Sequence, residues 1–171
     1  NLPASINAAL AQNASMQSAA RKLSEARDVL FLGRGFMYPL ALEGALKLKE
    51  ISYIHAEAYA SGELKHGPIA LVDKHVPVVV MAPRDNLFDK TVSNMQEVMA
   101  RKGKVVLISD NQGLEEASDG VWASIEMPSV PNIVAPIVYA IPAQLLAYHT
   151  AVAKGTDVDQ PRNLAKSVTV E

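Results

Sequence analysis

The chain has 171 residues, a length that fits one domain, and its 49% hydrophobic and 20% charged residues are typical of a folded protein. Its net charge of -2 gives no bias toward polyanions, so nucleic acid is not expected as a partner. The sequence has no cysteine, which excludes a disulfide framework, a thiolate metal site and a cysteine nucleophile within it and fits the reducing cytoplasm.

Hydrophobic periodicity predicts helices that alternate with short apolar strands. A helix is expected over residues 3–26, then a strand at 29–32, a Gly33-Arg34-Gly35 turn and a helix over 39–54 that Pro39 opens. The elements expected next are a strand at 76–81, a helix at 86–102, a strand at 105–109, a weaker strand at 121–127 and a long apolar helix at about 132–154.

Apolar strands that alternate with helices are covered on both faces. The pattern therefore predicts an α/β protein, a three-layer αβα sandwich around a mainly parallel, flavodoxin-like sheet. We expect one domain over residues 1–171, with a tail at 155–171. Ligands of such sheets bind beyond the carboxyl ends of the strands, which places residues 33–38 at a site and makes helix 39–54 its first wall.

An apolar run at residues 133–153 has about the 20 residues that a bilayer span needs. Pro136, Pro142, Gln144 and His149 interrupt the run, so a buried or interface helix is expected and no membrane partner. The sequence begins with Asn1, not methionine, and shows no secretory signal. We therefore expect a fragment or a processed product.

The Gly33-Arg34-Gly35 turn leaves room for a phosphate or a sugar near backbone N–H groups. The third glycine of a dinucleotide fingerprint is replaced by Tyr38, so a NAD site is disfavoured. A tight strand-to-helix turn without ligand contact explains the same residues at least as well.

Glu43, Lys47 and Glu50 share one face of the helix expected at 39–54. Their i, i+4 and i+7 spacing places them within an arc of roughly 60°. A carboxylate there can act as an acid or a base. The competing interpretation is an ordinary surface ion pair.

Residues 60–68 hold glycines, a proline and charged side chains, and they predict a shaped loop or a single helical turn. Histidine is a side chain type that can act as an acid or a base near neutral pH, so His66 in this segment is a candidate for proton transfer; a surface histidine is the alternative interpretation. His55, His75 and His149 lack a comparable setting, and a metal site is not expected.

The tail contains Lys166 among apolar residues. A lysine becomes a carbonyl nucleophile when desolvation or a nearby cation favours its neutral form. Leu164, Val168 and Val170 offer apolar anchors, and Arg162 offers the cation. A frayed chain end is the alternative.

Three segments together resemble one family: LEGALKLKEI at 42–51, SGELKHGP at 61–68, and the tail with QPRNLAKSVT at 160–169. They are similar to the isomerase region of the glutamine:fructose-6-phosphate aminotransferases, also called glucosamine-6-phosphate synthases. The resemblance is narrower to the second, C-terminal sugar isomerase (SIS) subdomain and covers essentially the whole chain. That family converts fructose 6-phosphate to glucosamine 6-phosphate with ammonia released from glutamine.

The resemblance implies a role for each matching residue. Lys166 would form a Schiff base with the open-chain sugar, and Glu50 would move a proton between C1 and C2. Lys47 would steady the charge beside that proton transfer, and Glu43 would line the same face of the helix. His66 would open the sugar ring from the neighbouring subunit, which implies a homodimer. The expected substrate-binding residues are Gly33, Arg34, Gly35 and Ala165, and no cofactor is expected.

This sequence lacks the family's glutaminase domain with its cysteine, and it lacks the first SIS copy with the loop that holds the sugar phosphate. We expect both upstream domains as partners in the full enzyme and little activity of this chain alone. The alternatives are a SIS module that binds a sugar phosphate without turnover and a part that serves only dimerisation. The catalytic interpretation also requires that the tail cross the carboxyl edge of the sheet and bring Lys166 to the cavity of Glu50.

Overall fold

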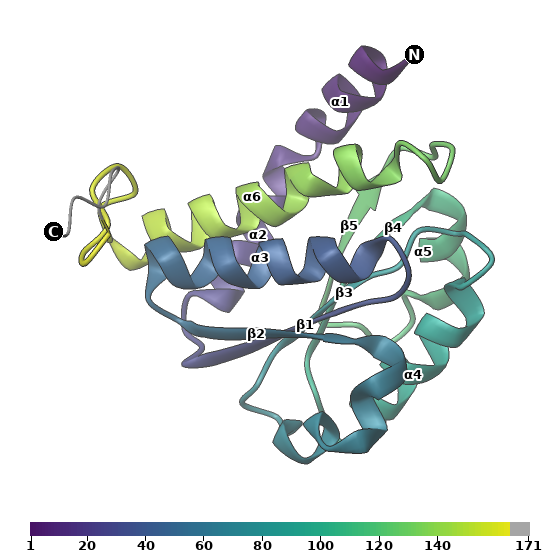
Figure 1. The fold of residues 1–171 in the computed structure, drawn as a ribbon, viewed down its shortest axis with the longest axis horizontal. Helices are drawn as coiled ribbons and strands as arrows, with labels where there is room; N and C mark the ends of the chain where they lie inside the picture. The colour runs from purple at the N-terminus through teal and green to yellow at the C-terminus, as the bar shows by residue number, and fades with distance from the viewer. Residues whose placement is uncertain (165–171) are drawn as a thin grey trace, which may run out of the picture.

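A computed structural model, which describes residues 1–164, has five parallel strands between two layers of helices (Figure 1). The strand order is β2-β1-β3-β4-β5, which confirms the expected α/β sandwich. The strands are β1 (Asp28–Gly33), β2 (His55–Ala60), β3 (Val78–Met81), β4 (Val105–Asp110) and β5 (Ala123–Met127). The helices are α1 (Leu2–Ala11), α2 (Asn13–Leu23), α3 (Met37–Ser52), α4 (Phe88–Ala100), α5 (Asn111–Ala117), α6 (Ala135–Lys154) and the 3-10 turns η1 (Ser61–His66) and η2 (Pro68–Leu71).

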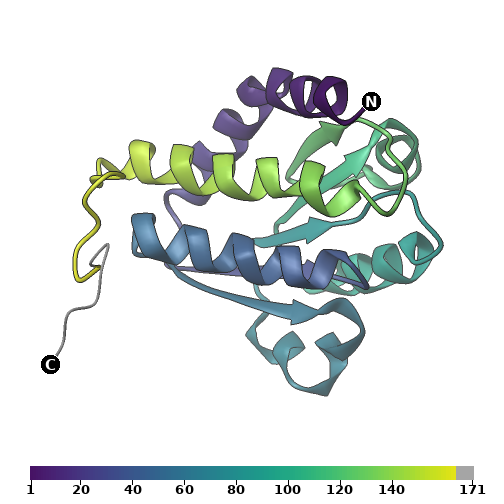
Figure 2. The ribbon, with the colours of Figure 1, turned by 45° about the horizontal axis from the view of Figure 1, so that its top comes forward.

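The buried strands send alternate side chains to two separate cores, as the period of two along a strand requires. Val29 and Phe31 of β1 face the layer of α2, α3 and α6, whereas Leu30 and Leu32 face α4. Figure 2 shows α3 and α6 side by side over the first face of the sheet. Burial of both faces explains why the central strands are almost entirely apolar.

Helices α3 and α6 run in the same direction across the sheet. Each follows a parallel strand, so each begins at the carboxyl edge, where the strands end, and finishes at the amino edge, where they begin. Both helices stop at a residue with left-handed backbone, Tyr53 (φ 62°) after α3 and Gly155 (φ 72°) after α6. The tail therefore starts at the amino edge.

Several expected elements differ from the structure. The single helix expected at 3–26 is two helices, which meet at Gln12. Strand β2 was not expected because HAEAYA has no large aliphatic residue. The strand pairs with one neighbour, at the edge of the sheet. Helix α5 was not expected because its seven residues are too few to show a recognisable helical period. Helix α3 starts at Met37, so Pro39 lies at its third position, where its missing N–H breaks no helical hydrogen bond.

None of the helices in residues 1–164 combines the length and the apolar character that a bilayer crossing would require.

Candidate functional site

The charged stripe on α3 forms as its spacing predicts. Lys47 Nζ lies 3.0 Å from a carboxylate oxygen of Glu50 and 3.8 Å from one of Glu43. The three side chains are about one-third exposed. Hydrogen bonding to Glu50, with the charges of both carboxylates, raises the pKa of Lys47 against the opposing effect of burial. Lys47 therefore remains a cation at neutral pH, held between two carboxylates.

The opposite face of α3 fixes the stripe to the sheet. Ala41, Ala45 and Leu48 are buried in the core between α3, α6 and the strands. At Gly44 the helix comes so close to β1 that an added methyl carbon would lie 2.8 Å from Cε1 of Phe31. The charged side chains consequently stand on a rigid helix, which suits groups that must hold a substrate atom in place.

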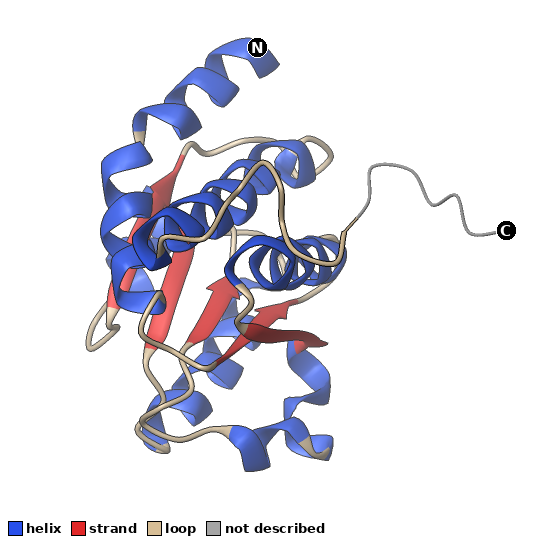
Figure 3. Ribbon diagram, turned by 90° about the vertical axis from the view of Figure 1, so that its left-hand side faces the viewer, coloured by secondary structure: helices blue, strands red, loops and turns tan. Residues whose placement is uncertain are grey.

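The described part of the tail returns from the end of α6 to the end of α3. The hydroxyl of Thr156 donates to the backbone oxygen of Ile51 (2.6 Å), and Asp157 Oδ1 accepts the backbone N–H groups of Asp159 and Gln160 (2.9 and 3.0 Å). Figure 3, which looks onto this side of the molecule, shows the loop crossing from one helix end to the other. These contacts order the segment over the last turn of α3.

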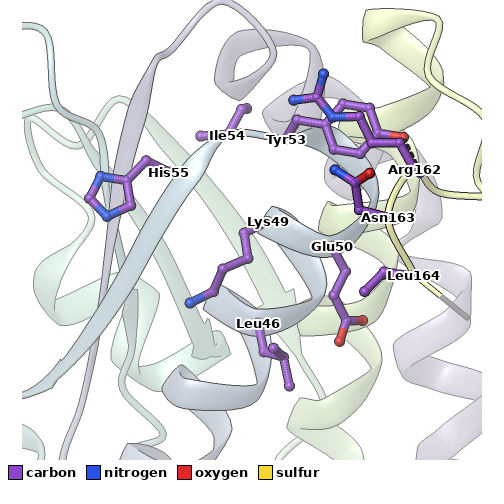
Figure 4. Close-up of a pocket in the computed structure, with 9 residues that line it drawn as sticks. All are labelled: Leu46, Lys49, Glu50, Tyr53, Ile54, His55, Arg162, Asn163 and Leu164. Carbon is purple, nitrogen blue, oxygen red and sulfur yellow. Dashed lines mark hydrogen bonds between the residues drawn. The ribbon is translucent and has the colours of Figure 1, made fainter. Parts of the chain in front are cut away.

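Tyr53 and Arg162 join the tail to the end of α3. The backbone N–H of Arg162 donates to the hydroxyl of Tyr53 at 3.0 Å, and the guanidinium carbon lies 4.1 Å from the centre of the ring. Figure 4 shows the guanidinium over the ring and the hydrogen bond beside it. Tyr53 was not predicted from the sequence as a functional residue, because its place just after a charged helix is the sole sequence feature that points to it.

The tail and α3 enclose two adjoining hollows of about 490 and 820 Å³. Glu50 and Leu164 line both of them. Lys49, Tyr53 and Arg162 complete much of the smaller hollow, which Figure 4 shows. The Glu50 carboxylate and the described end of the tail thus border the same two hollows. Ala165 and Lys166, the expected substrate contact and nucleophile, lie outside the described residues.

The expectation that the tail crosses the carboxyl edge of the sheet is wrong for residues 155–164. They lie at the amino edge, next to Ile51 and Tyr53, because α6 carries the chain across the whole sheet before the tail begins. Glu50 lies there too, in the last turn of α3. The cavity is therefore at the opposite edge from the one expected.

The Gly33-Arg34-Gly35 turn lies at the carboxyl edge, away from Glu50. A methyl carbon at Gly33 would lie 2.1 Å from the backbone oxygen of Met37, and Gly35 has a φ of 56°, so both glycines are needed for the turn itself. Arg34 lines a separate hollow of about 340 Å³ with Lys65 and residues of α4. The tight-turn interpretation accounts for these glycines, whereas the hollow leaves ligand contact open for Arg34.

His66 also lies at the carboxyl edge. It ends η1, directly after β2, and its Nδ1 is 2.7 Å from Glu63 with the side chain 71% exposed. Strand β2 spans about 20 Å at roughly 3.3 Å per residue, and it separates the end of α3 from η1. Within one subunit, Glu50 lines the hollows beside the tail at the amino edge, whereas His66 lies about one strand length away at the carboxyl edge.

Across residues 1–164 no three histidine or acidic side chains gather in a way that could hold a metal ion. His149 is half-buried and places Nε2 2.7 Å from Oδ1 of Asn13. Asp110 caps α5 by accepting the N–H of Gly113, and it is only 7% exposed.

Comparisons with known proteins agree on one family. The family model described as "SIS domain" matches residues 22–154. The glutamine–fructose-6-phosphate aminotransferase (isomerizing) of Zymomonas mobilis is 68% identical over 169 residues, which are 99% of this chain and 28% of that protein. The protein of the same name from Sphingobium yanoikuyae is 69% identical over 156 residues, 91% of this chain and 100% of that sequence.

A solved structure gives the same picture. The C-terminal domain of glucosamine-fructose-6-phosphate aminotransferase from Francisella tularensis aligns with a TM-score of 0.88 and 51% identity, over 94% of this chain and 45% of that one. This chain thus spans less than half of that domain and 28% of the Zymomonas relative.

Proposed function

This chain belongs to the SIS domain family and, within it, to the glutamine–fructose-6-phosphate aminotransferases, and from that membership we propose that it is the C-terminal part of an isomerase. The proposed enzyme converts fructose 6-phosphate to glucosamine 6-phosphate with ammonia from glutamine, in the cytoplasm. The upstream SIS and glutaminase domains are its proposed partners. The phosphate of the sugar is assigned to the upstream SIS copy, because the turn at residues 33–35 has no hydroxyl cluster.

The observation that carries the proposal is the meeting of α3 and the tail. Leu164, two residues before Lys166, lines the same two hollows as the Glu50 carboxylate. A nucleophilic amine and a proton-transferring carboxylate must reach adjacent atoms of one sugar, so they belong in one cavity. The position of Leu164 supports this pairing.

In the proposed chemistry, the neutral amine of Lys166 attacks the C2 carbonyl of the open-chain ketose, and loss of water gives an iminium ion. The iminium makes the C1–H bond more acidic. Ammonia then displaces Lys166 from C2, which frees the lysine amine and leaves the sugar as its C2 imine. Glu50 removes the C1 proton, and return of a proton at C2 gives the C2 amine while the C1 hydroxyl carbon becomes the aldehyde carbon of glucosamine 6-phosphate. Lys47, a cation 3.0 Å from Glu50 with Glu43 on its other side, keeps the carboxylate oriented as the proton moves.

His66 is proposed to open the sugar ring in the site of a second subunit. Its position at the carboxyl edge, about one strand length from Glu50, supports a contribution across a subunit boundary over one within the chain. An exposed imidazole can both donate and accept a proton near pH 7. The proposed active form is therefore a homodimer.

The test uses the full-length natural enzyme and its formation of glucosamine 6-phosphate from fructose 6-phosphate and glutamine. Lys166→Ala and Glu50→Gln should each lower kcat by at least 100-fold, the scale of general acid-base catalysis. Borohydride in the presence of fructose 6-phosphate should add one sugar mass to Lys166. Lys74→Ala and Glu115→Gln, at exposed positions outside the hollows, are matched controls that should keep full activity.

Sugar-phosphate binding without either turnover or a trapped adduct would replace this proposal with the non-catalytic binding module.

A further inference from the structure

Tyr53 has an unusual backbone for its residue type. It terminates α3 with φ 62° and ψ 14°, and its N–H donates to the backbone oxygen of Lys49 at 3.2 Å. Glycine and asparagine are the usual residues at this left-handed position, where a bulky side chain costs roughly 1–2 kcal/mol. Tyrosine is therefore less favourable than glycine for ending α3, so the contacts of its side chain matter.

That side chain holds the tail by both of its parts. The hydroxyl accepts the backbone N–H of Arg162 at 3.0 Å, and the ring lies under the guanidinium at 4.1 Å (Figure 4). Six residues earlier, the Thr156 hydroxyl is tied to the backbone oxygen of Ile51 at 2.6 Å. Residues 156–162 are thus pinned at both ends to the last turn of α3.

From these contacts we infer that Tyr53 is a positioning residue, which fixes Arg162 and thereby limits how far from this contact the Lys166 amine can act. This inference rests on the proposed function. Lys166 follows Arg162 by four residues, a reach of at most about 14 Å. Without the Tyr53 contacts the nearest pin is Thr156, ten residues away, with a reach of about 35 Å.

The consequence can be expressed as an effective concentration of the amine at the sugar carbonyl. For a flexible chain this concentration falls as the −3/2 power of length, so a change from four to ten residues between the contact and the amine lowers it by at most about four-fold, and by less where the Asp157 hydrogen bonds still hold residues 157–160. The fraction of enzyme with the amine in place falls equally. Because the sugar is bound mainly elsewhere, kcat should decrease while KM stays the same.

The experiment replaces Tyr53 by glycine in the full-length enzyme. Tyr53→Gly removes the ring and relieves the left-handed backbone, so α3 should end at least as stably as before. Lys102→Gly is the matched control, because Lys102 is exposed, has a φ of 65° and ends a helix at a distance from the tail. Arg162→Ala removes the guanidinium that lies over the Tyr53 ring, and Arg162→Lys keeps a cation at that position.

We expect Tyr53→Gly to lower kcat about two- to four-fold with an unchanged KM and an unchanged melting temperature. Hydrogen exchange of the peptide at 157–164 should quicken, and the pH profile of kcat should keep its shape. Arg162→Ala should have a similar effect and Arg162→Lys a smaller one, whereas Lys102→Gly should leave kcat and tail exchange as they are.

Wild-type kcat in Tyr53→Gly would overturn the inference, whether tail exchange quickens or not. A shifted pH profile in Arg162→Ala with a normal Tyr53→Gly would do so as well, because it would assign Arg162 to the charge of Lys166. If borohydride traps the sugar on Lys166 in these cases, the proposed function survives. If no adduct forms in the wild-type enzyme and Lys166→Ala stays active, the proposed function itself fails.

Discussion

Lys47 Nζ lies 3.0 Å from the Glu50 carboxylate within one turn of α3, and this contact raises the pKa of the lysine. Both side chains are partly exposed, so the pair contributes only a few tenths of a kcal/mol to the stability of the domain. Its significance lies in the orientation of Glu50, next to the tail.

The first prediction concerns Lys47→Met in the full-length enzyme. Stability in urea should change by less than about 0.5 kcal/mol, whereas kcat for isomerisation should fall about ten-fold, because the carboxylate loses its charged partner. Lys104→Met, a lysine that contacts the Trp122 ring and not the stripe, is the control. Equal rates for Lys47→Met and the wild-type enzyme would remove Lys47 from the proposed machinery.

The raised pKa of Lys47 also sets a direction for stability at high pH. A group whose pKa is higher in the folded state stabilises the fold below its unfolded value of about 10.5, and that contribution disappears as the pH rises through the folded value. Urea titrations between about pH 9 and pH 12 should therefore show a steeper loss of stability in the wild-type protein than in Lys47→Met. Identical slopes would contradict the contact.

Gly44 fixes the distance between α3 and β1. Gly44→Ala places a methyl carbon 2.8 Å from Phe31 Cε1, and we expect it to cost about 1–2 kcal/mol despite the higher helix propensity of alanine. Phe31→Leu combined with Gly44→Ala should recover part of the loss, although Phe31→Leu alone destabilises. If the two effects simply add in urea denaturation, the two residues are not in contact as described.

His149 predicts a loss of stability in acid. Burial lowers its pKa below 6.5, so the unfolded chain binds a proton that the folded protein resists. The free energy of unfolding should decrease as the pH falls through 6.5, until the folded pKa is passed. His149→Gln, which can still donate to Asn13, should make this part of the pH dependence shallower, whereas His75→Gln, an exposed histidine, should not.

Removing the Asp110 side chain tests how much a mostly buried helix cap contributes to the stability of the domain. Its two carboxylate oxygens accept the N–H groups of Arg84 (2.7 Å) and Gly113 (3.1 Å), which joins the end of β4 to the start of α5. Asp110→Ala should destabilise the domain by about 1–3 kcal/mol, because both donors lose their partner in a mostly buried place. Asp119→Ala, at an exposed turn, is the control. A loss below about 0.5 kcal/mol for Asp110→Ala would show that solvent replaces the carboxylate.

The layers of the fold could be predicted from the sequence because the central strands are nearly continuous apolar runs between amphipathic helices. Strand β2 could not, since HAEAYA lies at the sheet edge and needs little apolar surface. Its pairing with β1 depends on contacts between residues 27 positions apart, such as Asp28 with His55, which no local pattern reports.

The edge of the sheet at which the tail lies was predictable by simple length. Glu50 follows the first residue of α3, Met37, by 13 positions, and at about 1.5 Å per residue this is roughly 20 Å, the length of a strand. A helix that starts at the carboxyl edge must therefore bring Glu50 to the amino edge. The contact of Tyr53 with the tail could not be predicted from the sequence, because it depends on the tail folding back over the end of α3.

The most direct measurement is a crystal structure of the full-length enzyme with fructose 6-phosphate bound. We expect Lys166 Nζ at bonding distance from, or within about 3.5 Å of, C2 of the sugar, in the cavity that Glu50 and Leu164 line. Arg162 should remain on Tyr53 in that complex. A bound sugar near the Glu50 carboxylate with the Lys166 amine in bulk solvent in every subunit would contradict the proposed catalysis.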